Sequence, residues 1–277
     1  MTEYPITIII NTFKSDQKLL KCLKSIEEKY KVIVVENSDN YSFKNEIENN
    51  FPNVECIITE ENLGYAKGNN LGLSRVKSKY ALILNPDCIL EKNSIQNFLE
   101  TASKMENFAI IGPAHENTTK ATDVINSIIE VDSVKGFAMF FNLDKFSEVG
   151  FFDSNFFIYL EEIDLCRRVR KINNKIFLDP SIIVEHQGGS SHDKKYNYEM
   201  ELSRNWHWMW SLFYFNKKYK GFTMSLFILS PYFFSSALKV LIYFIFPNNT
   251  KRLIYKQRLS GLFNSMIGKK SWYRPSV

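Results

Sequence analysis

The clearest indication of the fold is the stretch Tyr80-Ala-Leu-Ile-Leu-Asn-Pro-Asp87. Its apolar run shows no polar alternation, which is typical of a short strand buried on both faces of a parallel sheet. Because Pro86 lacks a backbone N–H, the strand is predicted to end at Asn85. Asp87 then follows the carboxyl end of a central strand, where open α/β sheets bind ligands. A carboxylate there can hold a divalent cation against a diphosphate, although Asn-Pro-Asp is also ordinary turn chemistry.

Strand and helix patterns alternate around this stretch. Strands are predicted at Pro5–Asn11, Lys31–Glu36, Glu55–Thr59, Phe108–Pro113, Val134–Phe141, Lys175–Asp179 and Ile182–Glu185. Helices are predicted after a cap at Ser15 or Asp16, at Leu71–Val76 and Ser94–Met105, briefly at Leu143–Val149, and in the Phe151–Arg170 stretch. Residues 116–131 read as a loop or weak hairpin, and the chain begins β-α-β-β. The pattern predicts an α/β domain over residues 1–200, with a mostly parallel central sheet flanked by helices.

Composition narrows the class of protein. The 277 residues are 45% hydrophobic and 23% charged, which is typical of a folded protein with a sizeable core. Four scattered cysteines form no CxxC pair, so reduced cytosolic thiols are expected rather than disulfides or a zinc site. The N-terminus shows no basic segment leading into a long apolar one, so no export signal is expected.

Charge separates the last 77 residues from the rest. All 30 acidic residues lie at or before Glu201, whereas residues 202–277 hold 12 of the 35 basic residues and no acid. This basic region, residues 201–277, is predicted to be a helical appendage that meets an anionic surface. Its long apolar runs favour lipid, because nucleic-acid sites place aromatics between basic residues.

Two apolar blocks in this region set its expected relation to a membrane. Trp206–Phe215 is aromatic enough for an interfacial belt, and Phe222–Phe246 is long enough to span a bilayer. Since Ser230-Pro231 and Lys239 interrupt the second block, we favour two helices in the interface over a span. The basic stretch Lys251–Arg274 would lie on headgroups. Packing on the α/β domain or on a second copy of the chain stays open.

Candidate acid–base and metal-binding groups are concentrated between residues 151 and 191. Glu161, Glu162 and Asp164 fall in the first turn of a predicted helix, where the helix dipole already favours carboxylates. Crowded carboxylates also raise one another's pKa, which suits a general base. His186 ends a predicted strand before a glycine pair and could be a metal ligand or a plain loop residue. The Gly64–Gly68 turn could approach an anion at a helix N-terminus, or could simply begin that helix.

Taken together in order, these motifs resemble the family 2 glycosyltransferases, in their rhamnosyltransferase-like branch. The resemblance is carried by Asn11-Thr12, Val35–Ser38, Asn62–Tyr65, Leu84–Asp87, Phe157–Arg167 and His186–Ser190. It implies a GT-A fold, a nucleotide-sugar donor bound with Mg²⁺ or Mn²⁺, and inversion at the anomeric carbon. The metal would act as a Lewis acid on the leaving diphosphate.

The resemblance also implies residue roles. Asp87 and His186 would bind the metal, and Glu162 would be the catalytic base, at a position where the family commonly has aspartate. Donor-binding positions would be Thr12, Glu36, Asn62, Gly64, Lys67, Asn85 and Asp87. Tyr159, Glu161 and Asp164 would support the acceptor or the base. Glu36 also departs from the family, which usually has aspartate there.

The predicted function is transfer of rhamnose from dTDP-rhamnose to a hydroxyl of a lipid-linked glycan, during cell-surface polysaccharide synthesis at the inner face of the cell membrane. One alternative is a hexosyl- or galactofuranosyltransferase with a UDP-sugar donor. Another is a non-catalytic scaffold subunit that binds sugar nucleotides. A nucleic-acid partner is not expected, and homo-oligomerisation stays open.

Overall fold

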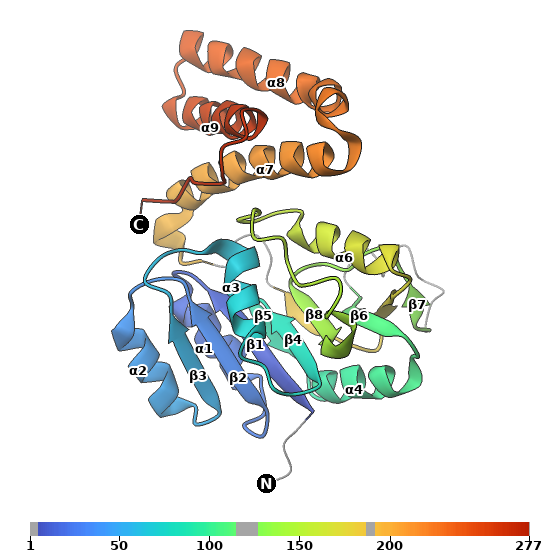
Figure 1. Ribbon diagram of the computed structural model, residues 1–277. Coiled ribbons are helices and arrows are strands. Elements are labelled where there is room, and N and C mark those ends of the chain that lie inside the picture. Colours follow the sequence, from blue (N-terminus) through green and yellow to red (C-terminus); the bar gives the residue numbers. More distant parts are fainter. Residues whose placement is uncertain (1–4, 115–126, 187–191, 277) are drawn as a thin grey trace. The chain divides into compact units, whose positions relative to one another are not determined.

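A computed structural model of the protein describes residues 5–114, 127–186 and 192–276 (Figure 1). The strands are β1 Ile6–Thr12, β2 Lys31–Glu36, β3 Val54–Ile58, β4 Tyr80–Leu84, β5 Cys88–Leu90, β6 Phe108–Pro113, β7 Ile129–Glu130, β8 Ala138–Asn142, β9 Lys175–Asp179 and β10 Val184–His186. The α-helices are α1 Asp16–Lys24, α2 Tyr41–Asn50, α3 Gly64–Leu73, α4 Ser94–Lys104, α6 Glu161–Lys171, α7 Asn197–Lys220, α8 Phe222–Ile245 and α9 Asn249–Met266. Short 3₁₀ helices are η1 Leu143–Lys145 and η2 Lys194–Tyr196.

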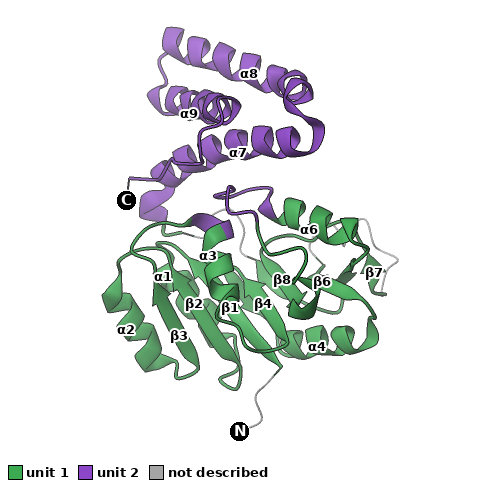
Figure 2. Ribbon diagram, viewed as in Figure 1, with its two compact units in different colours: residues 1–63, 67–152, 162–193 green, residues 64–66, 153–161, 194–277 purple. Residues whose placement is uncertain are grey.

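The chain forms two units (Figure 2). The sheet unit comprises residues 1–63, 67–152 and 162–193, and the helical unit comprises residues 64–66, 153–161 and 194–277. The sequence suggested a boundary at residue 200. The helical unit instead begins at residue 194 and takes in two short segments from the earlier part of the chain.

An eight-stranded sheet in the order β3-β2-β1-β4-β8-β6-β9-β7 organises the sheet unit. β3, β2, β1 and β4 run parallel, β8 runs antiparallel to β4 and β6, and β9 is parallel to β6. The predicted mostly parallel sheet is therefore confirmed. β5 and β10 form a separate antiparallel pair, in which His186 lies opposite Cys88.

Helices cover both faces of the sheet, as predicted. Ile6, Ile8 and Ile10 of β1 share a buried cluster with apolar residues of α1, α2 and α4. Ile9 points to the other face, against α3, where a Cβ on Gly72 would lie 2.4 Å from Ile9 Cγ2. In Figure 1, α3 and α6 lie in front of the sheet. All of β1 except Asn11 is buried, which explains its unbroken apolar sequence.

Several predicted bounds were wrong. The sequence prediction omitted α2, whose apolar face consists of only Phe43 and Ile47, although Asn40 caps it by accepting from the Phe43 N–H at 3.2 Å. It also omitted β5. The predicted helix at Leu143–Val149 is only the 3₁₀ turn η1, and α3 begins seven residues before Leu71. Ser15 does precede α1, but its hydroxyl donates to the Phe13 carbonyl and does not cap the helix.

In the helical unit, α7 and α9 pack closely. A Cβ on Gly261 would lie 2.1 Å from the Trp206 carbonyl oxygen, so glycine permits this contact. Trp206 and Phe213 are fully buried and Trp210 is 3% exposed. The prediction that this aromatic block forms an interfacial belt was therefore wrong: residues spaced by four and three positions share one helix face, and that face lies inside.

The predicted break at Ser230-Pro231 is also absent, because α8 continues through Pro231. Proline cannot donate to the Phe227 carbonyl four residues earlier. The Ser230 hydroxyl donates to that carbonyl instead, at 2.9 Å, which replaces the missing donor. Among the described residues, α8 is the one helix long and apolar enough to cross a membrane, judged by length and composition.

Candidate active site

The carboxyl edge of the sheet brings three predicted site residues together. Thr12 at the end of β1 lies in register with Glu36 at the end of β2. Ile10 pairs with Leu84, the last residue of β4, and Asp87 follows three residues later. All three polar side chains are buried, at 2%, 1% and 5% exposure. They lie where open α/β sheets bind ligands.

Each of these side chains keeps a buried oxygen that has no hydrogen-bond partner among the described residues. The atoms are Thr12 Oγ1, Glu36 Oε2 and Asp87 Oδ1. Burying such an atom without a partner costs about 1–3 kcal/mol, so native proteins rarely retain it without a reason. Three at one sheet edge indicate a site that a polar ligand completes.

Glu36 is the most perturbed of the three. Burial raises its pKa from the ordinary 4.5 to about 7, and the nearby Asp16 carboxylate adds to the rise. The Ser38 hydroxyl acts in the opposite direction by donating to Glu36 Oε1 at 2.6 Å. Near neutral pH, Glu36 can therefore present either a hydrogen-bond donor or an acceptor through Oε2.

The surrounding backbone at this edge is held by asparagine side chains that the sequence analysis did not single out. Asn37 Nδ2 donates to Asn11 Oδ1, while Asn37 Oδ1 accepts from the Leu63 N–H at 3.3 Å. A Cβ on Gly68 would lie 2.3 Å from Asn11 Oδ1, so Gly68 allows α3 to approach this pair. Asn37 belongs to the Val35–Ser38 motif and Gly68 to the Gly64–Gly68 turn. Only the contacts in the structure show that both residues help to hold the backbone at this edge of the sheet.

Asp87 and His186 form the strongest candidate metal site. Asp87 Oδ1 lies 3.5 Å from His186 Nε2, and the ligand atoms of Asp87, Cys88 and His186 lie within 4.8 Å of one another. A carboxylate oxygen and an imidazole nitrogen at this separation can both bind one Mn²⁺ or Mg²⁺ ion. The unpartnered Asp87 Oδ1 fits such an ion.

Cys88 is poorly suited to be a third ligand. Its thiol donates to the Phe137 carbonyl at 3.5 Å, and burial raises its pKa, so the thiolate is disfavoured. Phe137 also stacks on the His186 ring, with centroids 4.7 Å apart and planes 8° apart. Nothing in the sequence indicates this contact, because Phe137 is one apolar residue in a longer apolar run.

The Asn85 backbone joins the same neighbourhood. Its N–H donates to the Phe137 carbonyl at 2.8 Å, and its carbonyl accepts from the Cys22 thiol at 3.7 Å. Both contacts fix the turn that carries Asp87. Residues 187–190 of the His186–Ser190 motif lie outside the described residues.

The acidic cluster of the Phe151–Arg170 stretch divides into different roles. Glu162 is half-buried in the first turn of α6 and is not a member of the Asp87–Cys88–His186 cluster. Asp164 is fully buried and its Oδ2 accepts from Arg168 Nε at 2.8 Å. Arg168 in turn donates to the Val149 carbonyl at 2.8 Å and to the Phe151 carbonyl. Asp164 is thereby part of a structural ion pair.

Tyr159 and Glu161 belong to the helical unit. Tyr159 and Leu160 both have positive φ, at 74° and 68°, a conformation that costs about 1–2 kcal/mol per non-glycine residue. Burial raises the Tyr159 pKa to about 12, and its ring meets Trp208 edge-on at 5.6 Å. The Ser211 hydroxyl donates to the adjacent Ile158 carbonyl at 2.8 Å, so α7 helps to hold this strained segment.

Gly64 and its neighbours also differ from a simple anion-binding turn. Gly64 has φ +77°, and a Cβ there would lie 2.4 Å from the Phe157 ring. The Tyr65 N–H donates to the Phe157 carbonyl at 2.7 Å, so that amide at the start of α3 already has an acceptor. Asn62 is half-buried and Lys67 is exposed in the sheet unit.

The chain is similar to known proteins in sequence and in fold. The model of the family described as "Glycosyl transferase family 2" matches residues 7–167. The low-salt glycan biosynthesis hexosyltransferase Agl10 of Haloferax volcanii is 27% identical over 197 residues, or 62% of this chain and 63% of that protein. The rhamnosyltransferase WbbL of Escherichia coli K12 is 25% identical over 215 residues, or 65% of this chain and 80% of that protein. The match to Agl10 thus spans less than two thirds of its length.

Among solved structures, the mannosyltransferase PcManGT from Pyrobaculum calidifontis, in complex with GDP-Man and Mn²⁺, has a TM-score of 0.61 and 11% identity. The match covers 96% of this chain and 88% of that chain. At this identity the likeness concerns the fold, and it confirms the predicted GT-A type of architecture.

Proposed function

The chain belongs to glycosyl transferase family 2, and we propose that it transfers a sugar, with inversion, from a nucleotide sugar to an acceptor hydroxyl. The observation that carries the proposal is the buried Asp87 Oδ1 at the carboxyl edge of the sheet, which lies 3.5 Å from His186 Nε2 and has no hydrogen-bond partner among the described residues. When the sugar is transferred from a nucleotide sugar, the nucleoside diphosphate is the leaving group. The negative charge that develops on this diphosphate needs a cation or positive groups at such a position.

Asp87 and His186 are the proposed metal ligands. When bound, Mn²⁺ or Mg²⁺ would supply Lewis-acid stabilisation of the leaving diphosphate. A metal is supported by the donor set itself and by the Mn²⁺ in the solved mannosyltransferase complex. Thr12 Oγ1 and Glu36 Oε2 are proposed to hydrogen-bond the nucleoside, which would satisfy both buried atoms. Asn62, Gly64, Lys67 and the Asn85 turn are proposed to line the rest of the donor site.

Glu162 is the proposed catalytic base. It would accept the proton of the acceptor hydroxyl while that oxygen attacks the anomeric carbon. Compared with aspartate, the glutamate reaches one methylene further. Tyr159 and Glu161 are proposed to support the acceptor, because the strained backbone at Tyr159–Leu160 directly precedes Glu162 in the chain.

We propose rhamnose from dTDP-rhamnose as the donor, with a lipid-linked glycan as acceptor in cell-surface polysaccharide synthesis. The likeness to a named rhamnosyltransferase supports the sugar, and the likeness to a named hexosyltransferase keeps a UDP-hexose or galactofuranose donor as the alternative. The exposed apolar and basic surface of α8 and α9 supports the proposal that the enzyme acts at the inner face of the cell membrane. A non-catalytic scaffold is the remaining alternative.

A thermal-shift screen of nucleoside diphosphates and nucleotide sugars, with and without Mn²⁺, tests the donor site. A ligand present at about 100 times its dissociation constant adds about 2.7 kcal/mol to the stability of the folded protein. We expect a Mn²⁺-dependent shift with dTDP or dTDP-rhamnose, and loss of that dependence in His186→Ala. A larger shift with UDP would favour the hexosyl alternative. Absence of any shift would contradict the donor site, and a shift without metal-dependent donor hydrolysis would favour the scaffold.

A further inference from the structure

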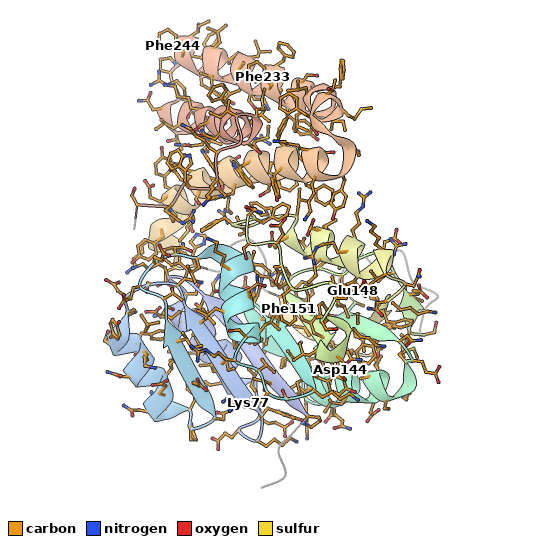
Figure 3. All side chains as sticks on the ribbon, in the orientation of Figure 1. Lys77, Asp144, Glu148, Phe151, Phe233 and Phe244 are labelled. Atoms are coloured by element: carbon orange, nitrogen blue, oxygen red, sulfur yellow. The ribbon has the colours of Figure 1, made fainter. Side chains whose placement is uncertain are left out.

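The α8–α9 hairpin carries an apolar surface and a set of cations that the sugar-transfer site does not use. Large side chains of α8 are strongly exposed, including Phe227 at 72%, Phe234 at 67%, Phe244 at 67% and Leu241 at 54%. Figure 3 shows the side chains of this helix, with Phe233 and Phe244 labelled. Such a contiguous exposed face is unusual for a protein in water and indicates a binding surface.

A groove of about 410 Å³ lies along this surface. Its lining residues come from α8 and α9: Ala237, Val240, Leu241, Phe244, Arg252 and Lys256. The groove therefore has an apolar wall on α8 and two cations on α9. This is the pattern of a site for an amphiphile that carries a phosphate.

Arg252 is held in place for such a ligand. Its Nη2 donates to Asn249 Oδ1 at 3.0 Å, and its guanidinium lies 5.8 Å from the centre of the Phe244 ring. Arg252 Nε is buried and has no hydrogen-bond partner among the described residues. An anion in the groove would supply the missing acceptor, and a guanidinium is suited to phosphate oxygens.

Charge identifies the occupant. Neither α8 nor α9 contains an acidic residue, so a second copy of the chain that docks through the same face would bring cations against cations. An anionic bilayer matches both features of this surface. Its hydrocarbon accepts the aromatic side chains of α8, and its headgroup phosphates attract the cations of α9.

The cations also determine how α8 meets the bilayer. Lys239 lies 4.8 Å from the centre of the Tyr255 ring, and Lys251 lies 5.6 Å from that of Tyr243. Because α9 packs along α8, a full crossing by α8 would draw the α9 cations into hydrocarbon, which is costly. The hairpin is therefore suited to lie in the interface.

We propose that the α8–α9 hairpin binds the headgroup region of an anionic membrane, with a lipid phosphate held between Arg252 and Lys256. The proposal rests on the proposed function in one respect, since it gives the lipid-linked acceptor of that function a surface at which to meet the enzyme. It names the residues that make the contact and predicts a preference for anionic lipid.

The test is sedimentation of the full chain with vesicles of phosphatidylcholine alone and with added phosphatidylglycerol. We expect binding to the anionic vesicles and a loss of about tenfold or more in Arg252→Gln/Lys256→Gln, since each cation near the surface contributes about a fivefold factor. Lys269→Gln/Lys270→Gln is the matched control, because it removes the same charge outside the groove. We expect this control variant to lose less binding to the anionic vesicles than the groove variant. Phe227→Ser/Phe234→Ser should weaken binding to both kinds of vesicle.

Three results would overturn the proposal. They are no binding to anionic vesicles, equal losses in the two double-glutamine variants, and a dimer that Phe227→Ser/Phe234→Ser dissociates without any vesicle binding. The Mn²⁺-dependent nucleotide shift, measured on the same preparations, checks that each variant is folded. It also separates the two ideas, because loss of vesicle binding with a normal nucleotide shift concerns the hairpin alone.

Discussion

Two regions of this protein treat buried polar atoms in opposite ways. At the carboxyl edge of the sheet, Thr12, Glu36 and Asp87 each keep a buried oxygen that accepts no hydrogen bond from the part of the chain that the structure describes. Where α9 and the segment after it pack on α7, Trp206 Nε1 donates to Ser260 Oγ at 3.1 Å and Trp210 Nε1 donates to the Lys269 carbonyl at 3.0 Å. The comparison teaches that buried polarity at α7–α9 stabilises the fold, while at the sheet edge it is left for a ligand.

The two histidines His207 and His186 show the same difference between the regions. The His207 ring is fully buried, with Nε2 2.8 Å from the Tyr273 carbonyl and Nδ1 2.9 Å from the Ser271 hydroxyl. Burial lowers its pKa to about 3, so it stays neutral at physiological pH. It therefore anchors the C-terminal segment to α7, whereas the His186 side chain is 32% exposed and lies beside a carboxylate oxygen that has no hydrogen-bond partner among the described residues.

The largest effect is expected at Asp87. Asp87→Ala should reduce metal-dependent sugar transfer by about 10³-fold or more, because Lewis-acid stabilisation contributes several kcal/mol and each ~1.4 kcal/mol is tenfold in rate. The melting temperature should change little, since Asp87 Oδ1 makes no hydrogen bond within the described residues. Steady-state kinetics with varied Mn²⁺ and a melting curve measure both quantities. Full activity in this variant would contradict the assigned site.

Glu162 and Asp164 sharpen the comparison within one helix turn. Glu162→Gln should lower kcat by about 10²–10⁴-fold, the usual contribution of a general base. Asp164→Asn should instead destabilise the protein by about 3 kcal/mol, because it breaks the buried ion pair with Arg168. Steady-state kinetics and denaturant unfolding of the two variants measure kcat and the free energy of unfolding, and so distinguish the two roles. The assignment fails if the Asp164 variant loses turnover while keeping full stability.

Glu36 should make stability depend on pH. Because its folded pKa of about 7 exceeds its ordinary value of 4.5, the folded state binds the proton more tightly. Its contribution is then fully present below about pH 4.5 and is lost as pH rises to about 7, amounting to about 3 kcal/mol. Urea unfolding between pH 5 and 8 should show this decline, and Glu36→Gln should flatten it. An unchanged pH profile in that variant would assign the dependence elsewhere.

The smallest effect is expected at the α7–α9 contact. Gly261→Ala should cost about 1–3 kcal/mol, because its Cβ would lie 2.1 Å from the Trp206 carbonyl and force the helices apart. The nucleotide-dependent thermal shift should persist. Gly268→Ala is the control: within the described ranges no atom lies within 4 Å of a Cβ at this position, so only the positive φ of +76° is penalised. Equal unfolding free energies for wild type and Gly261→Ala would show that this contact has room to relax.

Local sequence alone determined much of the sheet unit. The apolar runs of β2, β6 and β9 predicted those strands with the bounds that the structure has, and β4 ends one residue before the predicted Asn85, because a strand buried on both faces needs an unbroken apolar sequence. Asp87 could be placed at a strand end for the same local reason, since Pro86 ends the ladder. The family and its type of fold followed from the order of such motifs and are confirmed by the comparisons.

Only the tertiary structure decided which polar residues have partners. The i,i+4 spacing already allows a pair between Asp164 and Arg168, but only the structure shows that Asp164 is fully buried and that Arg168 also donates to the Val149 and Phe151 carbonyls. Nor does the local sequence show that Phe137 stacks on His186, or that Trp206 and Phe213 face inward while Phe227 and Phe244 face outward. The physical reason is that hydrogen bonding and burial depend on chain segments distant in sequence, whereas strand and helix periodicity depends on neighbours.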